Sequence, residues 1–388
     1  MSTLISILGK SKADPQTGYR TANYRFDKAF ARQVPFFGMA LLEYIKPDQL
    51  ILAGTSSSMW DVFFEHHQAD DESLLTLIDA VARGGVTQEM LVAHEQRLAE
   101  IIGIPVKCLL IPYAKSQDEQ VAILNDLAHV VPSGAEVILD VTHGFRHLPM
   151  LALVAARYLK HVRKVTVQEV YYGALEMSDA ITKEAPVLRL SGMLKMLDWT
   201  EALASYDHSG NYGVFSALLK ADGMDAAHAD RLSTAAFFER TSNTVKAKEA
   251  LSTVLKHAQT HQGPLGGLFS DTLSERISWF RKGTRADWEL ALADRYLAQN
   301  DHLRATIYLY ESFVSRAADK HEMDTNHYAS REDAFKRECE GQRDVRRLRN
   351  LRNAIAHGVL SESKEGKFLT DQKALEAELL RLRTRLFS

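Results

Sequence analysis

Short apolar segments alternate with helical segments along the first half of the sequence, and this alternation restricts the fold more than any other feature. The apolar runs typical of buried strands are Leu4–Leu8, Gln49–Ala53, Val106–Ile111, Val137–Val141, Val165–Tyr172 and Pro186–Leu190. Buried strands joined by helices indicate a mostly parallel sheet with helices on both faces. The sequence therefore predicts an α/β, Rossmann-like domain over residues 1–190.

After Ser191 the strand signals disappear, and helix-forming residues dominate to the end of the chain. The predicted helices are Trp199–Tyr206, Val214–Lys220, Ala227–Gln259, Leu273–Lys282, Ala286–Gln299, His302–Arg316, Arg337–His357 and Gln372–Leu386. We therefore expect a second, all-α domain over residues 191–388, and the boundary near 190 is a change of fold class.

The composition is that of a soluble globular protein, with 46% hydrophobic residues, 25% charged residues and a net charge of −3. Without an overall positive charge, any contact with nucleic acid must come from a local basic patch. Cys108 and Cys339 match no zinc-binding spacing, so we expect two reduced thiols. The N-terminal segment has no charged leader, and no apolar run approaches the length of a membrane span. We therefore expect a cytoplasmic protein with no membrane partner.

Small, hydroxylated and basic residues follow three of the predicted strands. They form the turns Gly9–Ser11, Gly54–Ser58 and Thr142–Arg146. Because the carboxyl ends of parallel strands lie at one edge of a sheet, we expect the three turns to meet there. N–H groups at helix N-termini bind anions, and an arginine such as Arg146 can hold a phosphate through two parallel hydrogen bonds. The turns thus predict an anion site, although Ser and Thr are also ordinary helix caps.

The turns match no standard nucleotide-binding motif. None of them is a Walker A loop or a G-x-G-x-x-G fingerprint, so a common mononucleotide or dinucleotide site is not predicted. His143 and His147 are four residues apart and, with Asp140, leave a metal-dependent hydrolase open as an alternative. Because no further ligand lies nearby in the sequence, we expect no metal.

A second polar cluster lies in the segment RRLRNLRNAIAHG, from Arg346 to Gly358. Apolar residues spaced by three and four predict a helix, and Gly358 suits its C-cap. Asn353 and His357 are four residues apart on one face, whereas Arg352 is rotated from His357 by about 140°. The helix dipole favours a protonated imidazole at His357. The cluster predicts a phosphodiester site, although arginine-rich helices are often only solvated faces.

Taken together, these segments resemble the CRISPR-associated ribonucleases of type III systems that join a CARF domain, which is a CRISPR-associated Rossmann fold, to a HEPN domain. The segments that carry the resemblance are LISILG, GTSSSMWD, DVTHGFRHLPML and RNAIAHG. The resemblance implies a CARF sensor domain over residues 1–190 and an all-helical HEPN ribonuclease domain over residues 191–388.

The resemblance implies that the sensor domain binds cyclic oligoadenylate as an allosteric activator, and it favours the ring of four adenylates over the ring of six. No other cofactor is expected. The messenger would lie between two sensor domains and be lined by Gly9, Lys10, Ser56, Ser57, Ser58, Met59, Thr142, His143, Gly144 and Arg146. Lys10 and Arg146 would contact its phosphates.

The resemblance also implies a homodimer, in which two copies of Arg352, Asn353 and His357 face each other and cleave single-stranded RNA without a metal. The RNA 2′-OH would attack the adjacent phosphate and leave a 2′,3′-cyclic phosphate and a 5′-OH. His357 would handle protons or stabilise the leaving oxygen, Arg352 would stabilise the charged transition state, and Asn353 would position one or the other. The neighbouring arginines would steer RNA or merely solvate the helix; they are Arg343, Arg346, Arg347 and Arg349.

Two alternatives stay open at this point. The chain could be a CARF-type sensor or scaffold without ribonuclease activity, with its helical half serving as an interaction module. The sensor domain could also degrade its own messenger as a ring nuclease, because Lys10, Ser56–Ser58 and Thr142 would lie near the phosphates.

Overall fold

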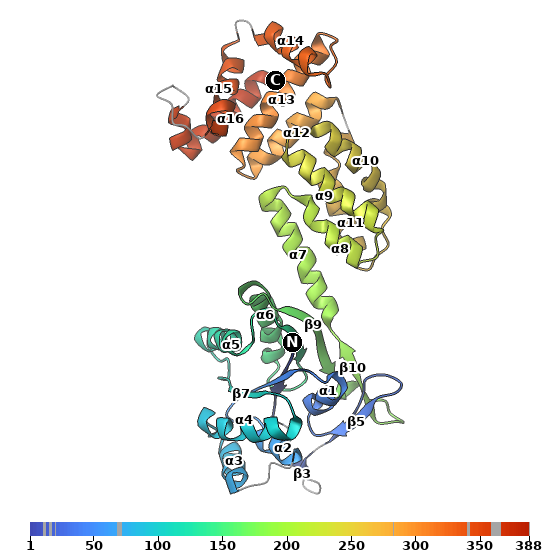
Figure 1. The fold of residues 1–388 in the computed structure, drawn as a ribbon, viewed down its shortest axis with the longest axis vertical. Helices are drawn as coiled ribbons and strands as arrows, with labels where there is room; N and C mark the ends of the chain where they lie inside the picture. The colour runs from blue at the N-terminus through green and yellow to red at the C-terminus, as the bar shows by residue number, and fades with distance from the viewer. Residues whose placement is uncertain are drawn as a thin grey trace. The chain divides into compact units, whose positions relative to one another are not determined.

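The computed structural model describes residues 1–10, 13–14, 18–19, 21–67, 72–281, 283–339, 342–357 and 366–387. Contacts within the chain divide it into two compact units, Met1–Leu194 and Lys195–Ser388 (Figure 1). The sequence placed the boundary at residue 190, and the division falls four residues later. Among the described residues, no helix is both long and apolar enough to cross a membrane.

The first unit is built on one mixed sheet, with strand order β5-β4-β10-β9-β8-β1-β6-β7. Its centre is parallel, as predicted, because β1 pairs with β6 and β8, β6 with β7, and β8 with β9. These central strands are β1 Ser2–Leu8, β6 Gln49–Gly54, β7 Val106–Leu110, β8 Glu136–Asp140 and β9 Thr166–Gly173. Along the chain, the strands first run outward from β1 to β7 and then continue on the other side of β1 with β8 and β9. The strand order therefore reverses between β1 and β8, which is where ligands bind in sheets of this type.

The other edge of the sheet is partly antiparallel. β10 runs antiparallel to β9, β4 is parallel to β10, and β5 is antiparallel to β4. These strands are β10 Glu184–Arg189, β4 Ala22–Arg25 and β5 Ala31–Val34, and the separate two-stranded ribbon consists of β2 Ala13–Asp14 and β3 Gly18–Tyr19.

Helices cover both faces of the sheet, as Figure 1 shows. Their bounds are α1 Phe37–Ile45, α2 Trp60–His66, α3 Glu72–Arg83, α4 Gln88–Ile102, α5 Gln117–Val130, α6 His147–Val162 and the short η1 Leu175–Met177. Leu4 and Leu8 of β1 pack into the apolar cluster that α1–α4 supply, whereas Ile5 and Ile7 pack against α5 and α6. Because successive strand residues point to opposite faces and both faces are covered, nearly every residue of β1 is buried. The predicted fold class, an α/β domain followed by a helical domain, is confirmed.

Within the described residues, the second unit contains only helices (Figure 1). They are α7 Ser191–Ser209, which begins in the first unit, η2 Tyr212–Val214, α8 Phe215–Ala221, α9 Ala226–Arg240, α10 Thr244–Thr260, α11 Gly266–Ile277, η3 Trp279–Arg281, α12 Arg285–Ala298, α13 His302–Lys320, α14 Tyr328–Cys339, α15 Arg343–His357, η4 Gly366–Thr370 and α16 Gln372–Phe387.

Two of the predicted helices each merge parts of two α-helices. The segment Ala227–Gln259 forms two helices, because Ser242 adopts a positive φ of 61° and the Asn243 side chain accepts a hydrogen bond from the Lys246 N–H and so caps α10. The segment predicted as one helix from Arg337 to His357 belongs to α14 and α15. The sequence hid most of α14 because its buried face includes a charged residue, Arg331.

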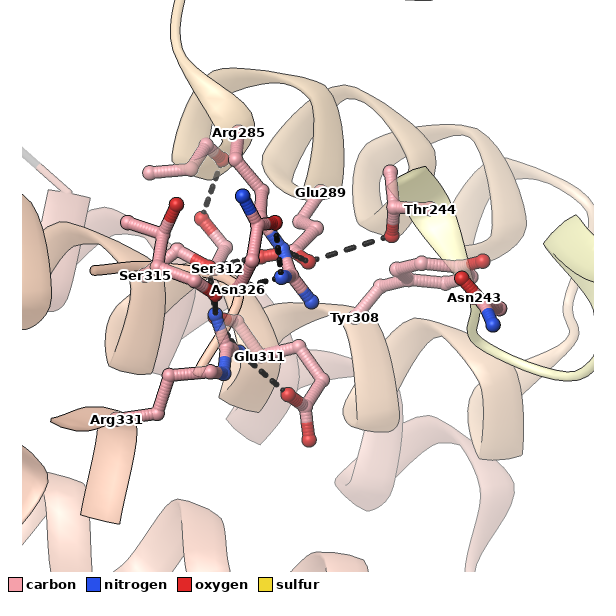
Figure 2. A network of polar contacts seen from close by, with 12 residues as sticks. Asn243, Thr244, Arg285, Glu289, Tyr308, Glu311, Ser312, Ser315, Asn326 and Arg331 are labelled. Carbon is pink, nitrogen blue, oxygen red and sulfur yellow. Dashed lines mark hydrogen bonds and ion pairs between the residues drawn. The ribbon is translucent and has the colours of Figure 1, made fainter. Parts of the chain in front are cut away.

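That arginine belongs to a buried polar network in the helical unit (Figure 2). At its centre Glu289 of α12 accepts hydrogen bonds from Arg285 Nε (2.8 Å), Ser315 Oγ (2.5 Å) and Thr244 Oγ1 (3.3 Å). Arg331 Nη1 in turn donates to Ser315 Oγ at 2.7 Å. The network joins α10, α12, α13 and α14, so every one of these helices has a fixed partner inside the unit.

Candidate functional site

Within the described residues, which leave out Ser11 of the first turn, the predicted turns of the first unit meet at the reversal of strand order. The backbone N–H of Met59, which follows β6, donates to the carbonyl of Gly9 at the end of β1 (3.0 Å). A Cβ atom placed on Gly9 would lie only 2.5 Å from the backbone nitrogen of Gly144, which follows β8. Gly144 itself has a φ of +99°, a conformation that favours glycine. Both glycines are therefore required for the turns after β1 and β8 to touch.

A buried carboxyl group supports the turn after β8. Asp140 is 1% exposed, accepts a hydrogen bond from Ser6 Oγ (2.6 Å), and accepts a second one from the Thr142 N–H (2.9 Å). Burial raises the pKa of Asp140 to about 6, because the charged form loses its hydration. The Thr142 hydroxyl accepts a hydrogen bond from the Gly173 N–H at the end of β9 (2.9 Å). Asp140 and Thr142 thus fix the turn to its neighbouring strands.

His143 is a structural partner of α1. Its Nε2 accepts a hydrogen bond from the N–H of Phe37, the first residue of α1 (3.0 Å). Burial lowers the pKa of His143 to about 4, so the imidazole is neutral near neutral pH and its Nδ1 carries the proton. The side chain of His143 therefore caps a helix and positions the turn.

The serine-rich turn after β6 divides into buried and accessible parts. Ser58 is 3% exposed; its hydroxyl donates to the Leu8 carbonyl (2.8 Å) and accepts from the Thr55 N–H (2.9 Å). Met59 is buried as well. The hydroxyls of Ser56 and Ser57 are less enclosed, so this turn can offer only these two to a ligand.

The loop after β7 adds residues that the sequence analysis missed. The hydroxyls of Tyr113 and Ser56 share a hydrogen bond (3.0 Å), which lowers the pKa of Tyr113. Lys115 Nζ lies over the Tyr113 ring, 4.7 Å from its centroid. Nε2–H of His147 donates to the Tyr113 carbonyl (2.9 Å), and the ring of Phe145 lies between Tyr113 and His147, with centroids 5.8 and 5.9 Å away. The position of this loop directly after a predicted strand was the signal available.

The two predicted phosphate ligands lie at the exposed edge of this arrangement. Lys10 follows the buried Gly9 and is exposed. Arg146 is the exposed residue before the first turn of α6, and it forms no hydrogen bond or ion pair with any residue that the structure describes. The accessible part of the rim therefore combines a free guanidinium, the N-terminus of α6, hydroxyls and aromatic rings. Such a combination can bind a phosphate next to a base.

The arrangement does not assemble the alternative metal site. Nε2 of His143 and Nε2 of His147 are each engaged with backbone groups, and Asp140 is bonded to Ser6 and Thr142. Among the described residues, no three His, Cys, Asp or Glu side chains are grouped where they could hold a metal ion.

In the second unit, α15 places the predicted phosphodiester residues at its C-terminal end. Arg352 is half-buried, with its guanidinium carbon 4.4 Å from the centroid of the Tyr310 ring of α13. Asn353 and His357 are exposed. Within the described residues, no hydrogen bond joins any of these three side chains to another of them, and the predicted C-cap, Gly358, lies outside the described residues. A single chain thus presents the residues side by side without completing a site.

The neighbouring arginines differ in availability. Arg347 forms an ion pair with Glu378 of α16 (3.1 Å) and lies over the Phe368 ring. Arg343, Arg346 and Arg349 are exposed. Of the arginines predicted to steer RNA, Arg347 instead has a structural contact.

The first unit matches a known protein family. Residues 3–176 match the family model described as "CRISPR system endoribonuclease Csx1, CARF domain". A CRISPR-associated protein of Methanocaldococcus jannaschii, MJ1674, is 25% identical over 251 residues. That match covers 58% of this chain but only 39% of the relative, so the activity of the whole protein is a matter for proposal. The first unit is thus similar to the CARF domain of a CRISPR endoribonuclease family.

Proposed function

We propose that this chain is a cyclic-oligoadenylate-activated, metal-independent endoribonuclease that cleaves single-stranded RNA in type III CRISPR defence. The observation that carries the proposal is the meeting of the three turns at the reversal of strand order, within the residues that match the CARF domain. A helical unit that ends in an R-x4-H segment follows the same domain.

The messenger would bind at the exposed edge of the turns. Arg146, Lys10 and the N–H groups at the start of α6 supply positive charge for phosphates. The hydroxyls of Ser56 and Ser57, with the rings of Tyr113 and Phe145, supply contacts for adenine and ribose. The remaining predicted residues act through the shape of the turn: Gly9, Ser58, Met59, Thr142, His143 and Gly144.

The site would be completed by a second copy of the chain. On α6, directly beyond the turn, Met150 and Val154 are exposed, and Val154 is 54% exposed. Exposed apolar side chains on one helix face favour association, and a two-fold axis beside them would bring two copies of the turn together. We therefore propose a homodimer.

Cleavage would take place where two copies of α15 meet. The exposed imidazole of His357 would move a proton or stabilise the leaving 5′ oxygen, while the RNA 2′-OH attacks its neighbouring phosphate. Arg352 would stabilise the additional negative charge, and its packing on Tyr310 restricts its conformations beforehand. Asn353 would position the phosphate or the imidazole. The products would be a 2′,3′-cyclic phosphate and a 5′-OH.

The messenger would act by shifting a population. If it binds more tightly to the dimer arrangement that brings the two copies of α15 together, it raises the fraction of active molecules by that difference in affinity.

A cleavage assay tests the proposal directly. Single-stranded RNA with a fluorophore and a quencher is incubated in EDTA with wild type and with His357→Ala, alone and with cyclic tri-, tetra- or hexa-adenylate. We expect one ring, the tetra-adenylate, to activate cleavage, and we expect His357→Ala to reduce the rate by at least about 100-fold. If the wild type cleaves no RNA with any ring, the ribonuclease assignment is overturned and the sensor or scaffold function is favoured.

A further inference from the structure

The helical unit contains a groove that the proposed nuclease residues do not use. Its volume is about 680 Å³, and its lining residues come from α9, the N-terminal end of α13 and η2, all within the second unit. The described residues that line it are Asn211, Gly213, Val214, Ser233, Phe237, Arg240, Thr241, Leu303 and Arg304. The lining combines an aromatic ring, two guanidinium groups, hydroxyls and an amide, without any carboxylate.

One wall of the groove is a continuous stripe of α9. Ser233, Phe237 and Arg240 follow one another at spacings of four and three residues, so they share one helix face, and Thr241 directly follows the end of α9. Phe237 is 61% exposed, although the adjacent Phe238 packs against the core of the unit. A large exposed ring in the wall of a groove offers a flat surface on which a planar group can stack.

The two arginines of the groove play different parts. Arg304 Nε donates to Asp301 (2.7 Å), and its guanidinium lies 4.4 Å from the centroid of the Tyr296 ring, so it is held in place and its charge is balanced. Arg240 is exposed and forms no ion pair with any described residue. Arg240 therefore gives the groove its net positive charge.

A second groove of the unit differs in that its lining includes a carboxylate, Glu338. Two of its cations are paired, Lys320 with Glu338 (2.6 Å) and Arg385 with Asp344 (3.1 Å), whereas, among the described residues, Arg316 donates only to the Leu386 carbonyl. A carboxylate in the lining repels a phosphate, so the second groove favours a polyanion less than the first.

We propose that the groove between α9 and α13 binds a segment of single-stranded RNA, with a base stacked on Phe237 and a phosphate held by Arg240. Stacking on aromatic rings beside basic residues is the usual way in which proteins bind single strands without reading their sequence. The choice of RNA as the ligand rests on the proposed function, since an endoribonuclease must hold its substrate on both sides of the cleaved bond. The groove would thus be a substrate-binding site away from α15.

Binding of RNA to the full chain tests the assignment. The protein carries His357→Ala so that the RNA stays intact, and the anisotropy of a fluorescently labelled single-stranded RNA gives the Kd. We expect Arg240→Ala to raise the Kd several-fold and to lower the slope of log Kd against log salt by about 0.7, the contribution of one phosphate contact. We expect Phe237→Leu to raise the Kd by about fivefold or more and Phe237→Tyr, which keeps a ring, to leave it nearly unchanged.

Arg231→Ala is the matched control. Arg231 is also an exposed arginine of α9, but it is nine residues from Arg240 and therefore on the opposite face of the helix. The proposal is overturned if Arg231→Ala weakens binding as much as Arg240→Ala, if neither groove variant changes the Kd, or if duplex RNA competes as well as single-stranded RNA. Because this test measures binding, it can be read even if the protein cleaves no RNA. Equally, a groove that does not bind RNA would not change the result of the cleavage assay.

Discussion

At the scale of single residues, the turn after β8 shows how polar side chains near a ligand site can have structural roles. Asp140, His143 and Ser58 all looked like ligand groups in the sequence, and each is bonded to the backbone or side chains of the sheet edge. Their burial gives Asp140 and His143 opposite pKa shifts. The accessible chemistry is left to exposed neighbours such as Arg146 and Phe145.

The two shifts predict opposing pH dependences of stability. The pKa of Asp140 rises from 3.8 to about 6 on folding, so the folded state binds an extra proton and its stability falls as the pH rises through that window. The pKa of His143 falls from 6.5 to about 4, so the unfolded state binds the extra proton and stability is lost as the pH falls through that window. Between pH 4 and 6 the two effects largely cancel in wild type.

Removing one of the two groups should therefore reveal the pH dependence of stability that the other group causes. Relative to wild type, we expect Asp140→Asn to lose stability as the pH is lowered from 6 to 4, and His143→Gln to gain it, each with a slope of up to about 1.4 kcal/mol per pH unit. Urea unfolding at several pH values measures both variants. Curves that run parallel to wild type for both would contradict the assignment of these shifts.

At the scale of elements, residues far away in the sequence cap several helices. His143 accepts from the first N–H of α1, and Asp222 accepts from the Gly266 N–H at the start of α11 (2.5 Å). Glu169 of β9 accepts from the Ser191 N–H at the start of α7 (3.0 Å). Such tertiary caps leave no local signal, which is why the start of α11 was predicted too late in the sequence.

The buried network around Glu289 predicts a large loss of stability when one partner is removed. Arg331 donates to Ser315 and to Glu311 (2.7 Å each), and replacing it with methionine leaves the Glu289 and Ser315 side of the network without this donor. We expect Arg331→Met to lower the free energy of unfolding of the helical unit by about 3 kcal/mol. Urea unfolding followed by circular dichroism gives the value.

Arg337→Met, on the same helix, is the control. Arg337 is exposed and pairs with Asp333 one turn away (2.8 Å), and exposed pairs of this kind contribute about 0.5 kcal/mol or less. If the two substitutions lower the free energy of unfolding equally, the buried network contributes no more to stability than an exposed ion pair. Arg331 contacts Ser315 of α13, the helix that also carries Tyr310 beneath Arg352.

At the scale of the whole molecule, the proposed activity depends on two copies of the chain. One copy presents a single Arg352, Asn353 and His357, and the edge of the three turns in the first unit is open. The exposed side chains of α6 are the surface that the proposal assigns to the partner.

A charge on that surface should separate the copies. We expect Val154→Glu on α6 to shift the protein toward the monomer and to reduce messenger-activated cleavage by at least about tenfold, because an ionised carboxylate would have to be buried in the interface. Light scattering after size-exclusion chromatography measures the mass. Val92→Glu on α4 is the control, since Val92 is 48% exposed against 54% for Val154. A dimer that survives Val154→Glu would place the interface elsewhere.

The sequence by itself was enough to predict the fold class and the participating turns. The alternation of apolar and helical segments predicts the buried strands, and the turns after β1, β6 and β8 follow from local patterns. Only the tertiary structure decided the strand order, the contact of Gly9 with Gly144, the arrival of Tyr113 beside Ser56 and the groove between α9 and α13. The physical reason is that local patterns report which residues avoid water, whereas these features depend on which distant elements pack together.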